Sequence, residues 1–128
     1  MSQMSNYLEN ALINATLRNT SYTSPATVYL ALFTSDPTDA GSGTEVSGSG
    51  YARNAIAFDA PSNGVTQNTA LESFTASGGS WGSVTHIGIY DASTAGNLLY
   101  HGALSTAKTV NNGDTLEFAV GAVIITLA

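Results

Sequence analysis

The sequence contains no cysteine and few charged residues. Without cysteine, disulfide bonds and cysteine-based metal sites are excluded. Three basic residues, Arg18, Arg53 and Lys108, stand against nine acidic ones, for a net charge of −6. A nucleic acid would find no basic stripe, so no nucleic-acid partner is expected. Charged residues make up 9% of the chain, against roughly 25% in average soluble proteins. Burial and backbone hydrogen bonds must therefore hold the fold.

Long apolar runs, basic leader segments and repeats are also missing. No stretch approaches the ~18 uninterrupted apolar residues of a membrane span, so no membrane partner is expected. The N-terminus lacks a basic region followed by an apolar run, which indicates synthesis in the cytoplasm without a secretory signal. Neither heptads nor a fixed-period repeat is found, which argues against a repetitive fibre shaft. The length of 128 residues fits one domain spanning 1–128.

The clearest positive feature is a strand within residues 25–37 that is apolar on both faces. Side chains alternate along a strand with period two. One face would carry Val28, Leu30 and Leu32, and the other Tyr29, Ala31 and Phe33. A strand of this kind must be covered on both sides, so it is predicted to be an inner strand of a packed β domain.

The residues that follow have the opposite character. From 35 to 50 the chain is rich in Asp, Thr, Ser and Gly, with Val46 as its one large apolar residue. This pattern predicts a long polar loop that reaches out to a partner, with Arg53 anchoring its far end through Asp36 or Glu45. Deletion of residues 39–49 is expected to leave a folded protein. The loop residues assigned to partner contacts are Asp36, Asp39, Glu45, Tyr51 and Arg53.

An amphipathic helix is predicted within residues 1–20. Ser5 is a suitable N-cap, Arg18 lies near the C-terminal end, and Leu8, Ala11, Leu12 and Ala15 form an apolar stripe. Ile13 and Leu17 lie off that stripe. Two interpretations stay open: the pair widens the buried face, which is favoured, or it forms a second face that contacts a partner.

Short strands with glycine-rich turns fill the rest of the sequence. The favoured fold is mainly β, an antiparallel jelly-roll or Greek-key sandwich with one N-terminal helix. Hairpins are expected between 84–90 and 97–104, and between 108–110 and 115–120 around an Asn-Gly turn. The expected strands are 51–58, 65–68, 71–75, 84–90, 97–104, 108–110, 115–120 and 123–127.

Candidate chemistry is sparse. His86, Asp91 and a serine such as Ser80 contain the residue types of a triad, but no serine lies in a nucleophile elbow, so the protein is not expected to be an enzyme. The carboxylates of Asp36, Asp39 and Glu45 are calcium-type ligands, but their spacing matches no calcium loop. His86 and His101 have no partner at zinc-ligand spacing. No metal or cofactor is therefore expected.

Aromatic residues raise sugar binding as an alternative. The rings of Tyr51, Trp81, Tyr90 and Tyr100 could form a platform for a glycan. Trp81 lies between glycine-rich turns at a strand entrance, where it can also fill one end of the core. Packing in the core or at a subunit interface is the favoured interpretation.

Several segments, in order along almost the whole chain, resemble a known family. They are the helical sequence 5–12, the strand 25–34 with Asp36-Pro37, the segment 43–46 leading to 50–53, Trp81-Gly82, and the segments 84–91, 96–102 and 108–114. The sequence of these segments is similar to that of small virion proteins of tailed bacteriophages, which are labelled capsid cement or tail-fibre proteins. The resemblance implies a structural virion role.

The predicted shape and surface of the protein favour the capsid surface over the tail as its location in the virion. A compact sandwich with an apolar-striped helix and a polar loop favours a capsid cement or decoration protein that bridges capsomers on the virion surface. The expected partners are the major capsid protein and copies of the chain itself, as a dimer or trimer. The alternative is a tail or tail-fibre module, with a glycan as a possible ligand.

Overall fold

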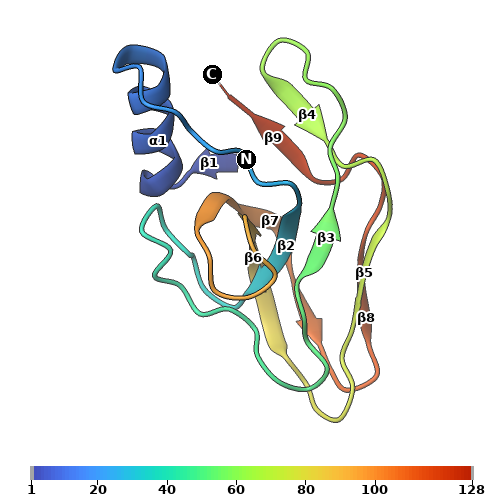
Figure 1. Ribbon diagram of the computed structural model, residues 1–128. Helices are drawn as coiled ribbons and strands as arrows, with labels where there is room; N and C mark the ends of the chain where they lie inside the picture. The colour runs from blue at the N-terminus through green and yellow to red at the C-terminus, as the bar shows by residue number, and fades with distance from the viewer. Residues whose placement is uncertain (1, 128) are drawn as a thin grey trace.

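A computed structural model describes residues 2–127 as a β structure with one helix (Figure 1). The expected mainly β, antiparallel architecture is confirmed. The elements are β1 (Ser2–Met4), α1 (Asn6–Leu17), β2 (Val28–Phe33), β3 (Asn54–Ile56), β4 (Val65–Gln67), β5 (Glu72–Thr75), β6 (Gly82–Tyr90), β7 (Leu98–Val110), β8 (Thr115–Phe118) and β9 (Ile124–Thr126).

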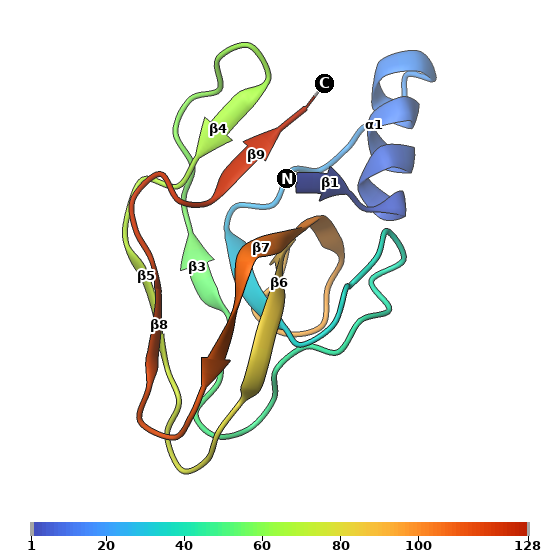
Figure 2. The ribbon, with the colours of Figure 1, turned by 180° about the vertical axis from the view of Figure 1, so that it is seen from behind.

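The strands form one large sheet and two ribbons. The large sheet has the order β1-β7-β6-β2-β3, and the two-stranded ribbons are β4-β9 and β5-β8. All strand pairs are antiparallel. Helix α1 and the β5-β8 ribbon lie at opposite margins of the molecule, with β6 and β7 between them (Figures 1 and 2). The arrangement is consistent with a jelly-roll type of sandwich whose second layer is split in two.

Strand β2 is an inner strand, as predicted, and it separates two apolar clusters. Leu30 and Leu32 belong to the main core, together with Trp81 and residues of both ribbons. Ala31 and Phe33 point the other way into a smaller cluster with Tyr90 and Leu98. The second cluster lies on the side of the sheet that α1 and the segment after β2 cover. This position brings the polar segment 35–50 against the protein body.

Helix α1 begins where the sequence predicts. The N-cap Ser5 accepts a hydrogen bond from the backbone N–H of Leu8 at 3.2 Å, and its hydroxyl donates to the carbonyl of Leu98 on β7. Ser5 and Leu8 are both buried. Because these contacts fix the first turn, the helix lies against β7 through the predicted stripe. No helix in the described part of the chain is long and apolar enough to cross a membrane.

The favoured interpretation of Ile13 and Leu17 is wrong. Ile13 is 52% exposed and Leu17 is 79% exposed, so neither side chain widens the buried face of α1. Helical geometry explains this position, since both project from the side opposite Leu8 and Leu12. The two side chains form an apolar pair on the outer surface of the helix.

One of the two predicted hairpins is confirmed. Strands β6 and β7 pair with register Ile89↔Tyr100 around the turn after Tyr90. The second hairpin does not form as a ladder: the turn after Val110 is present, but β8 pairs with β5 instead of β7. The reason is that the end of β7 already pairs with the start of β6, through Ser83↔Thr109. Strand β8 therefore leaves the large sheet and builds the second layer.

Candidate functional site

The segment 35–50 does not reach freely into solvent, because its first part is attached to β7. His101 on β7 is buried, with 4% of its surface exposed. Its Nε2 lies 2.8 Å from Oδ1 of Asp39, and its Nδ1 lies 3.8 Å from Oδ1 of Asp36. The backbone N–H of Asn6 also donates to the carbonyl of Asp39 at 2.9 Å. The predicted contact loop is thus attached to both the sheet and the helix.

The second half of the segment returns along β2. The backbone N–H of Thr34 donates to the carbonyl of Thr44, and that of Val46 donates to Leu32, both at 2.9 Å. Val46 is 6% exposed and belongs to the main core. At Gly43 an added Cβ would lie 2.6 Å from the carbonyl oxygen of Asp36, so only glycine fits this close approach. The segment therefore does not reach out freely from the body, and its role in contacting a partner stays a prediction.

Arg53 anchors the far end of the segment, and its partner is Glu45. Nε and one terminal nitrogen of Arg53 donate to the two carboxylate oxygens of Glu45, both at 2.9 Å. The other terminal nitrogen donates to the carbonyls of Ala92 and Ala95, at 2.9 and 2.8 Å. The guanidinium also lies 3.7 Å from the centre of the Tyr90 ring. This one side chain joins the polar segment to the turn between β6 and β7.

The Arg53 contact changes the ionisation of its neighbours. Burial raises the pKa of Glu45, but the hydrogen bonds from Arg53 and Tyr51 outweigh it, so the pKa of Glu45 is lowered overall. Burial and the hydrogen bond to Glu45 raise the pKa of Tyr51 far above its ordinary value. Tyr51 therefore stays a neutral donor to Glu45, and its oxygen accepts from the N–H of Leu32 at 3.0 Å.

The seven residues predicted to contact a partner fall into two groups. Glu45, Tyr51 and Arg53 are bound to one another, and Asp36 and Asp39 face His101 while their side chains stay 57% and 46% exposed. Ile13 and Leu17 form the exposed apolar pair of α1. Their roles as partner contacts stay predictions, and the fold makes the α1 pair the more accessible group.

His101 is the important residue that the sequence analysis did not single out as a partner of the loop. A histidine buried in a strand needs a hydrogen-bond partner. Asp39, 62 positions away in the sequence, supplies this partner at 2.8 Å, and Oδ1 of Asp36 lies 3.8 Å from Nδ1 of His101. No local pattern links the two, so the sequence carries no signal for this pair.

The loop carboxylates are not gathered into a calcium site. Glu45 is bound to Arg53, whereas Asp36 and Asp39 face His101. Within residues 2–127 no group of three or more metal-binding side chains is placed to hold an ion. The donor set therefore does not fit a bound metal.

The aromatic residues fill the core instead of forming a sugar platform. Trp81 is buried, donates from Nε1 to the carbonyl of Ser49 at 3.1 Å, and meets Tyr51 edge-to-face at 5.6 Å. Tyr90 is buried and stacks on Phe33 at 6.2 Å. Tyr100 packs against the main core. The favoured core interpretation is confirmed for Trp81 and Tyr90.

The residues considered for a triad have separate local partners. The ring of His86 bonds to the hydroxyl of Thr85 at 2.8 Å. Asp91 accepts from the backbone and side chain of Asn97. The hydroxyl of Ser80 accepts from the backbone N–H of Asn112 at 3.0 Å. The His86 contact lies within β6 and the other two lie at turns, and none of them joins His86 to Ser80 or Asp91 as a triad requires.

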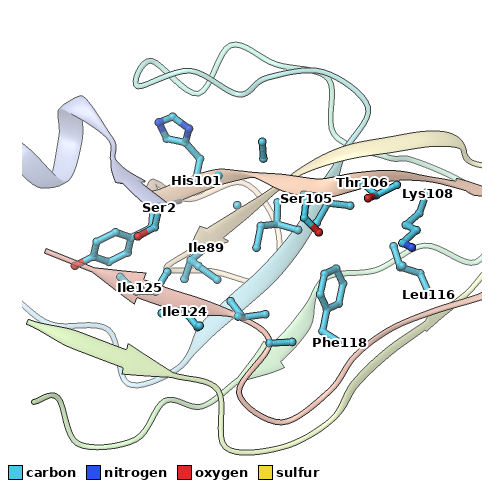
Figure 3. A pocket seen from close by; sticks show the side chains of 18 of the residues that line it. Ser2, Ile89, His101, Ser105, Thr106, Lys108, Leu116, Phe118, Ile124 and Ile125 are labelled. Carbon is cyan, nitrogen blue, oxygen red and sulfur yellow. The ribbon is translucent and has the colours of Figure 1, made fainter.

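One cavity is an apolar groove between the large sheet and the ribbons (Figure 3). Its volume is about 380 Å³, and Ile89, Leu116, Phe118 and Ile125 contribute to its walls. In Figure 3 the ring of His101 points away from this apolar interior. Lys108 supplies a cation at one end, and Glu117 is also among the lining residues. The groove is incompletely filled core space and lacks the convergent polar groups of a ligand site.

Comparison with known proteins identifies the family. None of the curated proteins with which the sequence was compared matches it. The family model described as podophage GP4 fiber I protein gp80 matches residues 3–126. That match covers the helix, every strand from β2 to β9, and both attachments of the polar segment. The chain therefore belongs to the podophage GP4 fiber I protein gp80 family of phage fibre proteins.

Proposed function

We propose that the protein is a structural subunit of a phage tail fibre and that it has no catalytic activity. The observation that carries this proposal is the match of a phage fibre family to residues 3–126. The family implies a component of the virion. We place the protein in the tail fibre because the family is one of phage fibre proteins, and this proposal replaces the capsid cement role that the sequence favoured.

The geometry supports a mechanical role. The polar segment is held at His101 and at Arg53, so the surface it presents is fixed before any partner binds. A preorganised surface loses less conformational entropy on assembly. Large apolar residues are exposed on α1, next to β5 and β8, and on the β4-β9 ribbon, as expected of a subunit that contacts neighbours. They are Tyr7, Ile13, Leu17, Val65, Leu71, Val120, Ile124 and Leu127.

Assembly partners follow from this role. We propose neighbouring fibre or tail subunits and other copies of the chain as partners, in place of the major capsid protein. The net charge of −6 opposes contact with nucleic acid. Because Trp81, Tyr90 and Tyr100 pack into the protein, we assign recognition of a host glycan to another subunit.

Immunogold labelling of intact particles tests the location. Antibodies raised against the purified protein should place gold on the tail region, at the fibres. A parallel grid labelled with antibodies against the major capsid protein provides the control for head labelling. Gold confined to the head would overturn the fibre proposal and support the cement role.

A further inference from the structure

The outer face of α1 carries a short seam of four residues, Asn6, Asn10, Ile13 and Leu17. All four are exposed. Their spacings of 4, 3 and 4 residues place them along one line of the helix, in the pattern of alternating a and d positions of a coiled coil. The opposite face is committed to the protein body through Leu8. The seam is therefore a second, unpartnered face of the same helix.

The seam is uncharged, although the chain is strongly acidic. Two copies of a molecule with a net charge of −6 repel each other unless they meet where charge is absent. Neither an acidic nor a basic residue occurs among the four seam positions. A second copy of the chain can approach here without placing like charges together. A basic partner would find no complementary carboxylate in the seam.

The order of residues selects a second copy in parallel orientation. In a parallel pair each residue meets its own copy, so Asn6 and Asn10 face asparagine while Ile13 and Leu17 face apolar groups. An asparagine amide has both donors and an acceptor and can bond to the same residue across a symmetry axis. Antiparallel packing would place Asn10 against Ile13 and leave the amide unpaired in an apolar contact. Within the described residues neither Asn6 nor Asn10 uses its side chain in a hydrogen bond.

We propose that α1 packs through this seam, in parallel, against α1 of a second copy of the chain. A helix of 12 residues is too short to associate by itself. Here the cap at Ser5 and the contact of Leu8 with the body hold it helical beforehand. This contact rests on the proposed function in that it specifies how copies of the chain meet, but its test does not depend on where the protein lies in the virion.

Cysteine crosslinking tests the register, because the natural chain has no cysteine of its own. The Ile13→Cys variant should form a disulfide-linked pair rapidly under mild oxidation. The matched control is Thr16→Cys, which is also exposed on α1 but lies beside the seam, and should crosslink at least about tenfold more slowly, a difference of about 1.4 kcal/mol. Equal crosslinking rates for the two variants would overturn the proposal that the copies meet through the seam. Crosslinking only in a mixture of Asn10→Cys and Ile13→Cys would overturn the parallel orientation.

Sedimentation of the cysteine-free protein provides an independent measurement. Wild-type protein should sediment above its monomer mass of 13.1 kDa, and Leu17→Lys should shift it towards the monomer. Ser83→Lys is the control, since Ser83 is exposed at the start of β6, receives the same added charge and is not among the exposed apolar residues. Circular dichroism confirms that both variants fold. A wild-type monomer, or equal effects of both substitutions, would overturn the proposal.

Discussion

At the scale of single residues, Arg53 links distant parts of the chain. Its guanidinium makes four hydrogen bonds, to Glu45, Ala92 and Ala95, and lies over Tyr90. The flat, forked geometry of arginine suits this set, whereas a lysine ammonium cannot reproduce it. The side chain of Arg53 is 7% exposed, so these contacts are well shielded from water.

The Arg53→Ala variant should lower the free energy of unfolding by about 3 kcal/mol, because it leaves Glu45 without its cation. Arg53→Lys should lower it by a smaller amount. Urea unfolding followed by the fluorescence of Trp81, the sole tryptophan, measures both. Arg18→Lys is the control, since Arg18 is exposed and should change stability by less than about 0.5 kcal/mol. An Arg53→Ala loss as small as the control would show that the contact is not structural.

Glu72 is a buried carboxylate whose ionised form lowers the stability of the folded protein. Burial raises its pKa, although the nearby Asn54 partly opposes the shift. The folded protein therefore holds the Glu72 proton more tightly than the unfolded chain. The free energy of unfolding therefore falls as the pH rises from the pKa of Glu72 in the unfolded chain to its higher pKa in the folded protein. At neutral pH Glu72 is ionised, and its full destabilising effect is present.

The Glu72→Gln variant should have a higher melting temperature than wild type at about pH 7, since glutamine carries no charge to bury. The difference should shrink as the pH falls to about 4, where the wild-type carboxyl is protonated. Thermal unfolding at a series of pH values measures both effects. A Glu72→Gln protein that is less stable at neutral pH and equal to wild type only in alkali would contradict the assignment.

At the scale of elements, the segment 35–50 is part of the fold. Asp39 contacts His101, Glu45 contacts Arg53, and Val46 lies in the main core. Backbone hydrogen bonds from Asn6 to Asp39, from Thr34 to Thr44 and from Val46 to Leu32 add to these attachments. This differs from the free loop predicted by its composition.

Deletion of residues 39–49 should therefore abolish cooperative unfolding instead of leaving a folded protein. The deletion removes Val46 from the core, leaves buried Arg53 without Glu45, and leaves buried His101 without its hydrogen-bond partner Asp39. Calorimetry measures the loss of the transition. Ser47→Ala serves as control, because Ser47 is exposed and should leave the melting temperature unchanged. If the deletion protein melted at the same temperature as wild type, the segment would not be needed for folding and would behave as a free loop.

At the scale of the whole molecule, the two margins have different characters. One margin carries α1 and the attached polar segment, the opposite margin carries the β5-β8 ribbon, and the β4-β9 ribbon lies at the top of both views (Figures 1 and 2). A subunit with contact surfaces at both margins can join neighbours on two sides. This arrangement suits a fibre component, and it arises without a sequence repeat because assembly, not the chain, supplies the repetition.

The sequence by itself determined what depends on local pattern. Alternation made β2 apolar on both faces, Ser5 capped α1, and the few charges near residue 53 paired Arg53 with a loop carboxylate. The tertiary structure alone decided which distant segments pair: β8 with β5, and His101 with Asp39. Side-chain periodicity is fixed over a few residues, whereas partners far apart in the chain are selected only when the layers pack together.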